Sequence, residues 1–288
     1  MSETITFGAA QIPVTPDIDK NIVTIKSAID WAEKENVNYL VTPEGSLSGY
    51  VPTFNEDCPE WKIQKALEEV LEYSSEKKVG LALGTKYKEG GFVYNQIRVY
   101  DENANFQGSH DKMYSVANWD RCEFPSRVDP ITIKFKNYKI KALCLICNDL
   151  WGGYMQLAYP LLNLVREEDT KSHIVLHSSN GFRGYEMQVE DVLYEFHNSV
   201  LRWGSFNYHT HIVTADNCLT MDGCEYEGRT SSRSGIVYNG TWLTEEKNIG
   251  TQYFKVELDL ELLTNDGYNV DPDEKIKKEK GIQSMVLR

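Results

Sequence analysis

The sequence predicts a single layered α/β domain. Strand-like and helix-like segments alternate along almost the whole chain, as they do in sheets that are covered by helices. Several of the strand-like segments are almost wholly apolar, which is typical of strands buried on both faces. No internal repeat, linker or low-complexity segment divides the 288 residues. We therefore predict one domain over residues 1–264, followed by a polar C-terminal tail or arm over residues 265–288.

The first half of the chain predicts strands separated by two amphipathic helices. In the first helix Ile22, Ile25 and Ile29 recur at the spacing of one helical face. The strands are short runs of apolar and β-branched residues that end at turn residues. The expected elements are strand 4–11, helix 19–36, strand 39–42, helix 59–77, strand 79–84, and a hairpin of 92–100 with 105–108.

The second half predicts further strands and one long helix. Residues 109–114 come first and are followed by a long irregular stretch through Asp129, and a loop of that length is more often functional than idle. The expected strands are 131–135, 138–146, 173–176, 211–217, 235–238 and 252–260, with a loop at 178–184. The apolar side of the long helix is expected to carry Val189, Val192, Leu193, Phe196, Val200 and Trp203.

Cys147 stands at the end of the most apolar of these strands. It is followed by Asn148 and Asp149, and apolar residues then recur at helical spacing from Tyr154 to Val165. Cys147 is therefore expected between the end of a buried strand and the start of a helix. A thiol near a helix N-terminus is favoured as the thiolate, so the position suits a nucleophile.

Other interpretations of the cysteines stay open at this point. Most cysteines in apolar strands are buried and inert, and Cys144 is most simply one of these. Cys144 and Cys147 also have the spacing of a redox pair or half a metal site, although residues three apart on a strand point to opposite faces. His209 and His211 share one face of a strand, but two histidines without a third ligand indicate a metal only weakly.

The composition argues against several partners. The formal net charge of −13 would repel nucleic-acid phosphates and anionic membranes. The sequence contains no apolar run of 18 residues and no charged-then-apolar leader. Six cysteines, mostly in apolar contexts, are typical of reduced thiols. We expect a soluble, cytoplasmic protein that binds neither nucleic acid nor membrane.

Three polar residues, Glu44, Lys112 and Cys147, each follow an expected strand. Together with their neighbours they resemble the nitrilase, or carbon–nitrogen hydrolase, superfamily over nearly the whole chain. The resemblance implies an α/β fold, a four-layer α-β-β-α sandwich of the nitrilase type, and a homodimer or larger even-numbered oligomer. The matching blocks are Phe7-Gly8-Ala9-Ala10-Gln11, Pro43-Glu44-Gly45 with Gly49-Tyr50, Tyr94-Asn95, Asp111-Lys112-Met113, Cys147-Asn148-Asp149 and Ala215-Asp216-Asn217.

The resemblance also implies a catalytic triad of Glu44, Lys112 and Cys147. Glu44 would take the proton of Cys147, and the thiolate would attack the carbon of a small amide or N-carbamoyl amine. Lys112 and the backbone N–H of Asn148 would stabilise the oxyanion, ammonia would leave, and water would release the acid from a thioester. This chemistry needs no metal and no organic cofactor. The alternative is a catalytically idle member that binds a metabolite or a protein partner.

The expected substrate neighbours come from the loops around the triad. Glu123 lies where many members of the superfamily place a second glutamate. The full set of expected substrate-binding residues is Tyr50, Trp119, Glu123, Asn148, Trp151, Asn180 and Phe182.

The residues after the cysteine block bear on the charge of the substrate. Members that hydrolyse N-carbamoyl amino acids tend to have arginines there, where this chain has Leu150 and Trp151. An apolar residue cannot replace the bidentate fork that binds a carboxylate. We therefore expect a neutral or cationic small amide, or a carbamoyl amine, in preference to N-carbamoyl amino acids, with nitriles a distant third. Arg121 and Arg183 could still reach the site from their loops.

Overall fold

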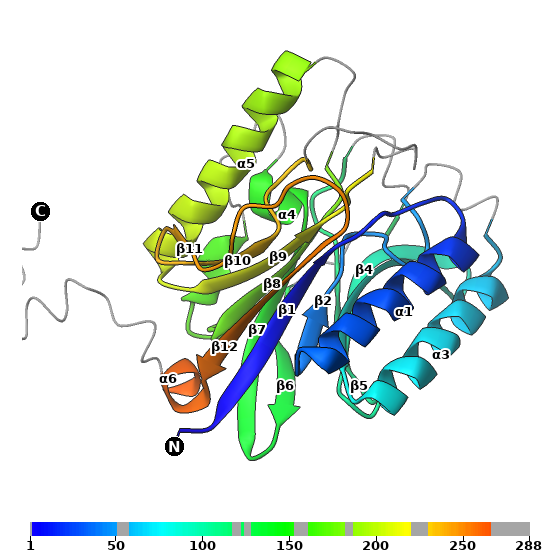
Figure 1. The fold of residues 1–288 in the computed structure, drawn as a ribbon, viewed down its shortest axis with the longest axis horizontal. Helices are drawn as coiled ribbons and strands as arrows, with labels where there is room; N and C mark the ends of the chain where they lie inside the picture. Colours follow the sequence, from blue (N-terminus) through cyan, green and yellow to red (C-terminus); the bar gives the residue numbers. More distant parts are fainter. Residues whose placement is uncertain are drawn as a thin grey trace, which may run out of the picture.

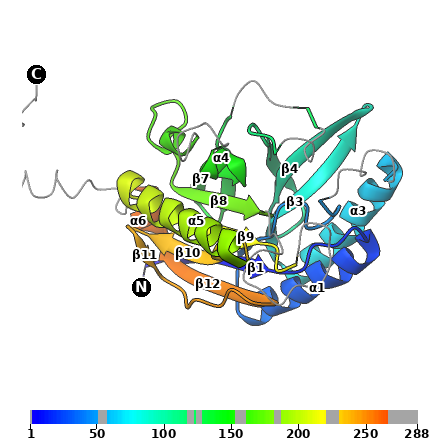
Figure 2. The ribbon, with the colours of Figure 1, turned by 90° about the horizontal axis from the view of Figure 1, so that it is seen from above.

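The computed structural model describes residues 2–50, 58–116, 122–123, 128–152, 161–181, 187–219 and 230–265, without the side chains of residue 163 and residues 187–191. Within this part of the chain, two six-stranded sheets lie face to face. Helices α1 (Ile18–Lys34) and α3 (Glu60–Lys77) cover the outer face of one sheet, and α5 (Met187–Tyr208) covers that of the other (Figure 1, Figure 2). The layers are α-β-β-α, so the fold class implied by the resemblance is confirmed.

The first sheet has the strand order β12-β1-β2-β3-β4-β5. Its central strands β1, β2 and β3 run parallel, and the outer pairs are antiparallel. α1 starts after Asp17, whose side chain accepts hydrogen bonds from two backbone N–H groups of the first turn. The strands are β1 (Thr4–Gln11), β2 (Tyr39–Val41), β3 (Gly80–Glu89), β4 (Phe92–Tyr100), β5 (Phe106–Asp111) and β12 (Gln252–Asp259).

The second sheet has the order β11-β10-β9-β8-β7-β6, and β7, β8 and β9 run parallel at its centre. Its strands are β6 (Ile131–Phe135), β7 (Tyr138–Ile146), β8 (Ile174–Ser179), β9 (His211–Asp216), β10 (Gly235–Tyr238) and β11 (Thr241–Trp242). Three short helices follow strands or loops: α4 (Asn148–Trp151), η1 (Leu162–Val165) and α6 (Leu260–Thr264).

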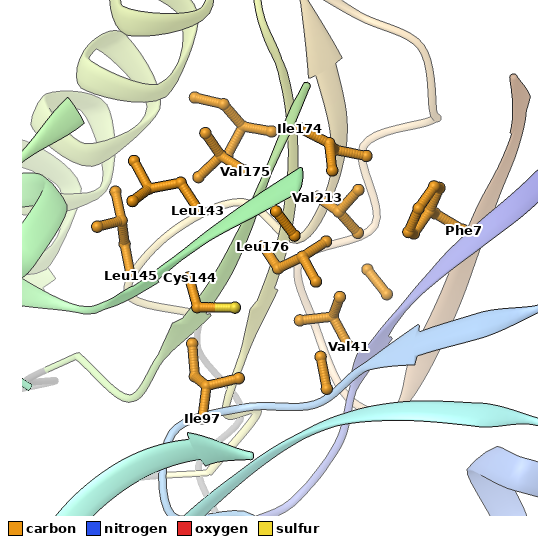
Figure 3. Close-up of a cluster of buried hydrophobic side chains, with 14 of the residues drawn as sticks. Phe7, Val41, Ile97, Leu143, Cys144, Leu145, Ile174, Val175, Leu176 and Val213 are labelled. Carbon is orange, nitrogen blue, oxygen red and sulfur yellow. The ribbon is translucent and has the colours of Figure 1, made fainter. Parts of the chain in front are cut away.

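Alternating side chains of the second sheet build two separate layers of core. On β7, Leu143 and Leu145 lie on the side of the sheet that faces α5, whereas Cys144 points toward Val41 and Ile97 of the first sheet (Figure 3). This follows from the two-residue period of a strand. A strand buried on both faces therefore needs the nearly continuous apolar sequence that made β7 recognisable.

Most predicted elements are confirmed, some to the residue. β1, β4, β6 and β7 have the predicted bounds. The predicted loop 178–184 is wrong in part, because β8 continues through Ser178 and Ser179, and β5 extends past its predicted end at residue 108 to Asp111. Ser178 is tolerated in the core because its hydroxyl donates to the Thr42 carbonyl of the other sheet at 2.7 Å. The helix predicted after Cys147 is also wrong where it is described: α4 has four residues, and η1 is a 3-10 helix.

The predicted apolar side of α5 is only partly buried. Val200 packs in the core, but Val192, Phe196 and Trp203 are 69%, 43% and 56% exposed. Helical spacing alone does not tell a covered apolar face from an exposed one. None of the helices in the described ranges is both long and apolar enough to cross a membrane. The predicted tail lies outside the described residues except for Asn265.

The second sheet contains buried histidines that predict loss of stability in acid. Burial lowers the pKa of His177 to about 3 and that of His211 to about 3, from an ordinary value of 6.5. Between pH 6.5 and 3 the unfolded chain therefore binds protons that the folded chain does not, so the free energy of unfolding falls as the pH falls. We expect about 1 kcal/mol per pH unit for each histidine.

Urea unfolding at pH 7, 6, 5 and 4 measures this dependence. His211→Gln removes one of the titrating rings. The free energy of unfolding of this variant should therefore fall less steeply with decreasing pH than that of the wild type, by the contribution of one histidine. Equal slopes for the two proteins would contradict the assignment.

Candidate active site

Glu44 lies in a tight turn that is closed by small residues. β2 ends at Val41, and the turn that follows lies against β3 at Gly84, where an added Cβ would stand 2.0 Å from the carbonyl oxygen of Pro43. Gly45 has a φ of +67°, which L side chains rarely adopt. The residues of the proline–glutamate–glycine block therefore place the backbone of Glu44 directly against the neighbouring strand.

The carboxylate of Glu44 forms a buried ion pair with Lys112. Lys112 directly follows β5, and its Nζ lies 2.7 Å from Oε1 of Glu44, with side-chain exposures of 1% and 0%. Asn95 donates to the same oxygen at 2.8 Å, and the Lys112 ammonium also lies 3.2 Å from the hydroxyl of Tyr50. A buried ion pair persists only where hydrogen bonds replace the lost water, and these contacts supply them.

Lys86 is a second buried lysine beside this pair. It lies opposite Asn95 in the β3–β4 ladder, so the two side chains rise on the same face of the sheet. Its Nζ and that of Lys112 each lie 5.3 Å from the centre of the Tyr50 ring. Lys86 is 1% exposed. Lys86 was not among the residues predicted for the site, because it lies beyond the predicted strand end at residue 84, in a polar run with Lys88 and Glu89.

Cys147 lies at the end of β7 in a strained backbone conformation. Its φ of 46° and ψ of −104° lie outside the regions that non-glycine residues usually adopt. Its carbonyl accepts from the N–H groups of Leu150 and Trp151, which starts α4 immediately. The cysteine is 4% exposed. Conformations of this kind gather at functional sites, where the surrounding structure enforces them.

The end of β8 brings the cysteine and the glutamate to the same place. The N–H of Cys147 donates to the carbonyl of Ser178 at 2.9 Å, and the N–H of Glu44 donates to the next carbonyl, that of Ser179, at 3.2 Å. Asn180 then donates from its side chain to the carbonyl of Glu44 at 3.3 Å. Glu44, Lys112 and Cys147 therefore gather at one end of the two sheets.

The expected substrate neighbours differ in where the structure places them. Tyr50 and Asn180 are buried against the Glu44 region, as described above. The Asn148 side chain is partly exposed and donates to the Ser115 carbonyl at 3.2 Å. The side chain of Glu123 is exposed, so the structure does not bring it into the buried cluster. Trp119 and Phe182 lie outside the described residues, as do Arg121 and Arg183.

The ring of Trp151 is used for packing. It stacks on His197 of α5 with the ring centres 4.4 Å apart, and it meets His177 edge-on at 4.8 Å. Trp151 is 2% exposed. These contacts hold the ring against β8 and α5, and the substrate-binding role expected of Trp151 stays a prediction.

Cys144 has the environment of a structural cysteine. It is 1% exposed among apolar side chains between the sheets, and burial raises the pKa of its thiol to about 12 (Figure 3). Neither Cys144 nor Cys147 forms a disulfide in the structure. Within the described residues, no three histidine, cysteine, aspartate or glutamate side chains gather as a group that could hold a metal ion.

Comparison with known proteins places this fold and site in a family. A family model for carbon-nitrogen hydrolases matches residues 6–230. Because that model spans most of the 288 residues, the chain belongs to the carbon-nitrogen hydrolase family, whose reaction is hydrolysis of a carbon–nitrogen bond. None of the curated proteins compared matches this chain.

Solved structures of the nitrilase superfamily share the fold. The NitN amidase from Nesterenkonia sp. AN1 is similar over 96% of this chain and 99% of its own, with 17% identity and a TM-score of 0.69. A glutamate-to-glutamine mutant of that amidase, with acrylamide added at its active-site cysteine, has 16% identity over 96% of this chain and 99% of its own, with a TM-score of 0.69. Both likenesses concern the architecture.

Proposed function

We propose that this protein is a cysteine hydrolase that cleaves a small amide, or an N-carbamoyl amine, through a thioester and releases ammonia. The observation that carries the proposal is the buried Glu44–Lys112 pair, gathered with Cys147 at one end of the two sheets. An ion pair without exposure to water is costly to keep unless its charges are used or fully compensated. A carboxylate, an ammonium and a thiol together supply a base, an oxyanion partner and a nucleophile.

In the first half of the reaction, Glu44 takes the proton from the thiol of Cys147. The thiolate attacks the substrate carbonyl carbon and forms a carbon–sulfur bond, while the π electrons of the carbonyl move to its oxygen. The Lys112 ammonium and the backbone N–H of Asn148 together stabilise the negative charge on that oxygen. Glu44 returns the proton to the nitrogen as the carbon–nitrogen bond breaks, which leaves ammonia and a thioester on Cys147.

In the second half, water takes the place of the amine. Glu44 removes a proton from the water, the resulting hydroxide attacks the thioester carbon, and the carbon–sulfur bond breaks. The carboxylate is therefore needed twice. Its position is fixed by Lys112 and Asn95 at Oε1, so it does not have to be reordered between the two halves.

Lys86 bears on the charge of the preferred substrate. Lys86 and Lys112 are both buried beside Glu44, each with its Nζ 5.3 Å from the centre of the Tyr50 ring. A cationic substrate would be repelled at short range in an environment that screens charges poorly. This argues against the cationic amides that the sequence alone left open, and we propose a neutral small amide.

Ammonia release over a substrate panel tests the function. The panel contains neutral amides, cationic amides, N-carbamoyl amines, N-carbamoyl amino acids and nitriles. We expect the neutral amides to have the highest kcat/KM. No turnover of any member would favour the idle alternative, and a strong preference for carboxylate-bearing members would overturn the proposed substrate class.

Two cysteine variants are the controls for that assay. Cys147→Ala should abolish turnover, because no other described thiol shares its position beside Glu44 and Lys112. Cys144→Ala removes a core sulfur and should lower the free energy of unfolding by about 1 kcal/mol, while most activity remains. Equal loss of activity from both substitutions would contradict the single-nucleophile mechanism.

Replacement of Glu44 should expose the intermediate. Glu44→Gln keeps the shape of the side chain but cannot take a proton from the thiol or from water, so both halves should slow severely. Any acylation that survives should leave a thioester on Cys147 that is visible by intact mass spectrometry. Steady-state rates like those of the wild type would remove Glu44 from the mechanism.

We also propose that a second copy of the chain covers the exposed face of α5, in keeping with the oligomer that the resemblance implied. Val192, Phe196, Trp203 and Phe206 are between 43% and 69% exposed along this helix, and large apolar side chains grouped on one surface are typical of interfaces.

Light scattering of purified protein tests this interface. Trp203→Lys should shift the mass from dimer toward monomer. Trp61→Lys is the matched control, because Trp61 is a 64%-exposed tryptophan on α3, in the opposite outer layer of the fold. A wild-type protein that is monomeric at micromolar concentration would overturn the proposal.

A further inference from the structure

We propose that Asp149, acting with His110, is the positioning residue that holds Lys112 in place relative to Cys147. The inference rests on the proposed function, because it assigns a purpose to the relative position of two residues of the triad. Asp149 acts through its hydrogen bonds to the chain around Lys112 and before Cys147.

Asp149 is a fully buried carboxylate with four hydrogen-bond donors around it. Oδ1 accepts from the backbone N–H groups of Met113 at 3.0 Å and Tyr114 at 2.9 Å. Oδ2 accepts from the backbone N–H of Ile146 at 3.0 Å and lies 2.8 Å from Nε2 of His110. The exposure of Asp149 is 0%. Hydrogen bonds to an ionised acceptor are the stronger kind, and burial makes their loss costly.

These donors belong to the segments that carry Lys112 and Cys147. His110 and Met113 lie on either side of Lys112, and Ile146 directly precedes Cys147. One carboxylate therefore links the backbone before the nucleophile to the chain on both sides of the lysine.

Sheet hydrogen bonds cannot supply this link. β5, which ends next to Lys112, is an edge strand of the first sheet, whereas β7, which ends at Ile146, belongs to the second. The two sheets meet mainly through apolar packing, which is not directional. Asp149 adds directional contacts at the point where lysine and cysteine must keep a fixed separation. A misplacement of about 1 Å at such a site can cost about 100-fold in rate.

The chemistry of the four contacts requires an aspartate. All the backbone partners donate, and His110 donates when Nε2 carries the ring proton. Asparagine has a single acceptor oxygen. Its amide nitrogen, which donates, would therefore face either the Met113 and Tyr114 N–H groups or the Ile146 N–H and His110, and it could not accept from them. In the same way, a glutamine at position 110 could donate to Oδ2, but a leucine could not.

Kinetics of three variants test the inference. Asp149→Asn should lower kcat about 100-fold with KM changed less than about threefold, because the substrate still binds while the oxyanion partner is displaced. His110→Leu should lower kcat about 10-fold with KM again nearly unchanged, and His110→Gln should restore most of kcat. A general loss of structure would not be rescued by the glutamine.

Asp101→Asn is the matched control. Asp101 also accepts four hydrogen bonds, two of them from backbone N–H groups, but it lies in the turn at the opposite end of β5 from Lys112. This variant should keep kcat and KM within about twofold of the wild type. Loss of kcat in Asp101→Asn as large as in Asp149→Asn would overturn the assignment, since any weakening of the β4–β5 hairpin would then have the same effect.

Hydrogen exchange read by mass spectrometry gives a test that does not depend on activity. In Asp149→Asn and His110→Leu, exchange should accelerate in the peptides that contain residues 112–114 and 146, and stay unchanged in α1 and α3. If the wild type releases no ammonia, the proposed function is wrong, while hydrogen exchange still tests whether Asp149 holds the Lys112 and Cys147 segments together. If the wild type is active and Asp149→Asn retains kcat and exchange protection, the positioning inference alone is wrong.

Discussion

The site depends on keeping an ion pair out of water. Glu44 and Lys112 lose nearly all their hydration, and neither charge would be stable in that position without the other. Neighbouring side chains supply hydrogen bonds that replace the lost water. Asn95 donates to the carboxylate, and the Tyr50 hydroxyl lies within hydrogen-bond distance of the ammonium. Gly84 also contributes to the position of the ion pair, because only a residue without a side chain lets the turn that carries Glu44 lie so close to β3.

A second constraint is that the three residues of the proposed triad are divided between two sheets. Glu44 and Lys112 follow strands of the first sheet, and Cys147 follows a strand of the second. A sandwich core fixes the distance between sheets, but it does not fix how one slides over the other. Polar contacts at one end of the sandwich remove that freedom. The carbonyl of Ser179, the hydroxyl of Ser178 and the carboxylate of Asp149 all make such contacts across the two sheets.

The strands and most helices were predictable from the sequence because burial dictates their composition. β7 is apolar on both faces and was predicted to the residue, as were β1, β4 and β6. The ends of β5 and β8 were not, because His110, Ser178 and Ser179 look like loop residues until their partners across the sandwich are known. The triad residues followed from a resemblance, whereas Lys86 and Asp149 required the three-dimensional neighbours. The exposure of the apolar side of α5 could not be predicted for a related reason: periodicity defines a face but not what covers it.

Cys144 and Cys147 have different environments because one lies inside β7 and the other directly follows it. Cys144 lies inside the strand, so the alternation of side chains points its sulfur between the sheets, where burial raises the pKa of the thiol to about 12 (Figure 3). Three residues later the strand has ended, and the backbone of Cys147 turns through a φ of 46° that a continuing strand does not allow. That turn takes Cys147 out of the alternation and toward the strand end where Glu44 also lies. Backbone hydrogen bonds to β8 and α4 hold this strained conformation, and they keep Cys147 beside the strand end where Glu44 lies.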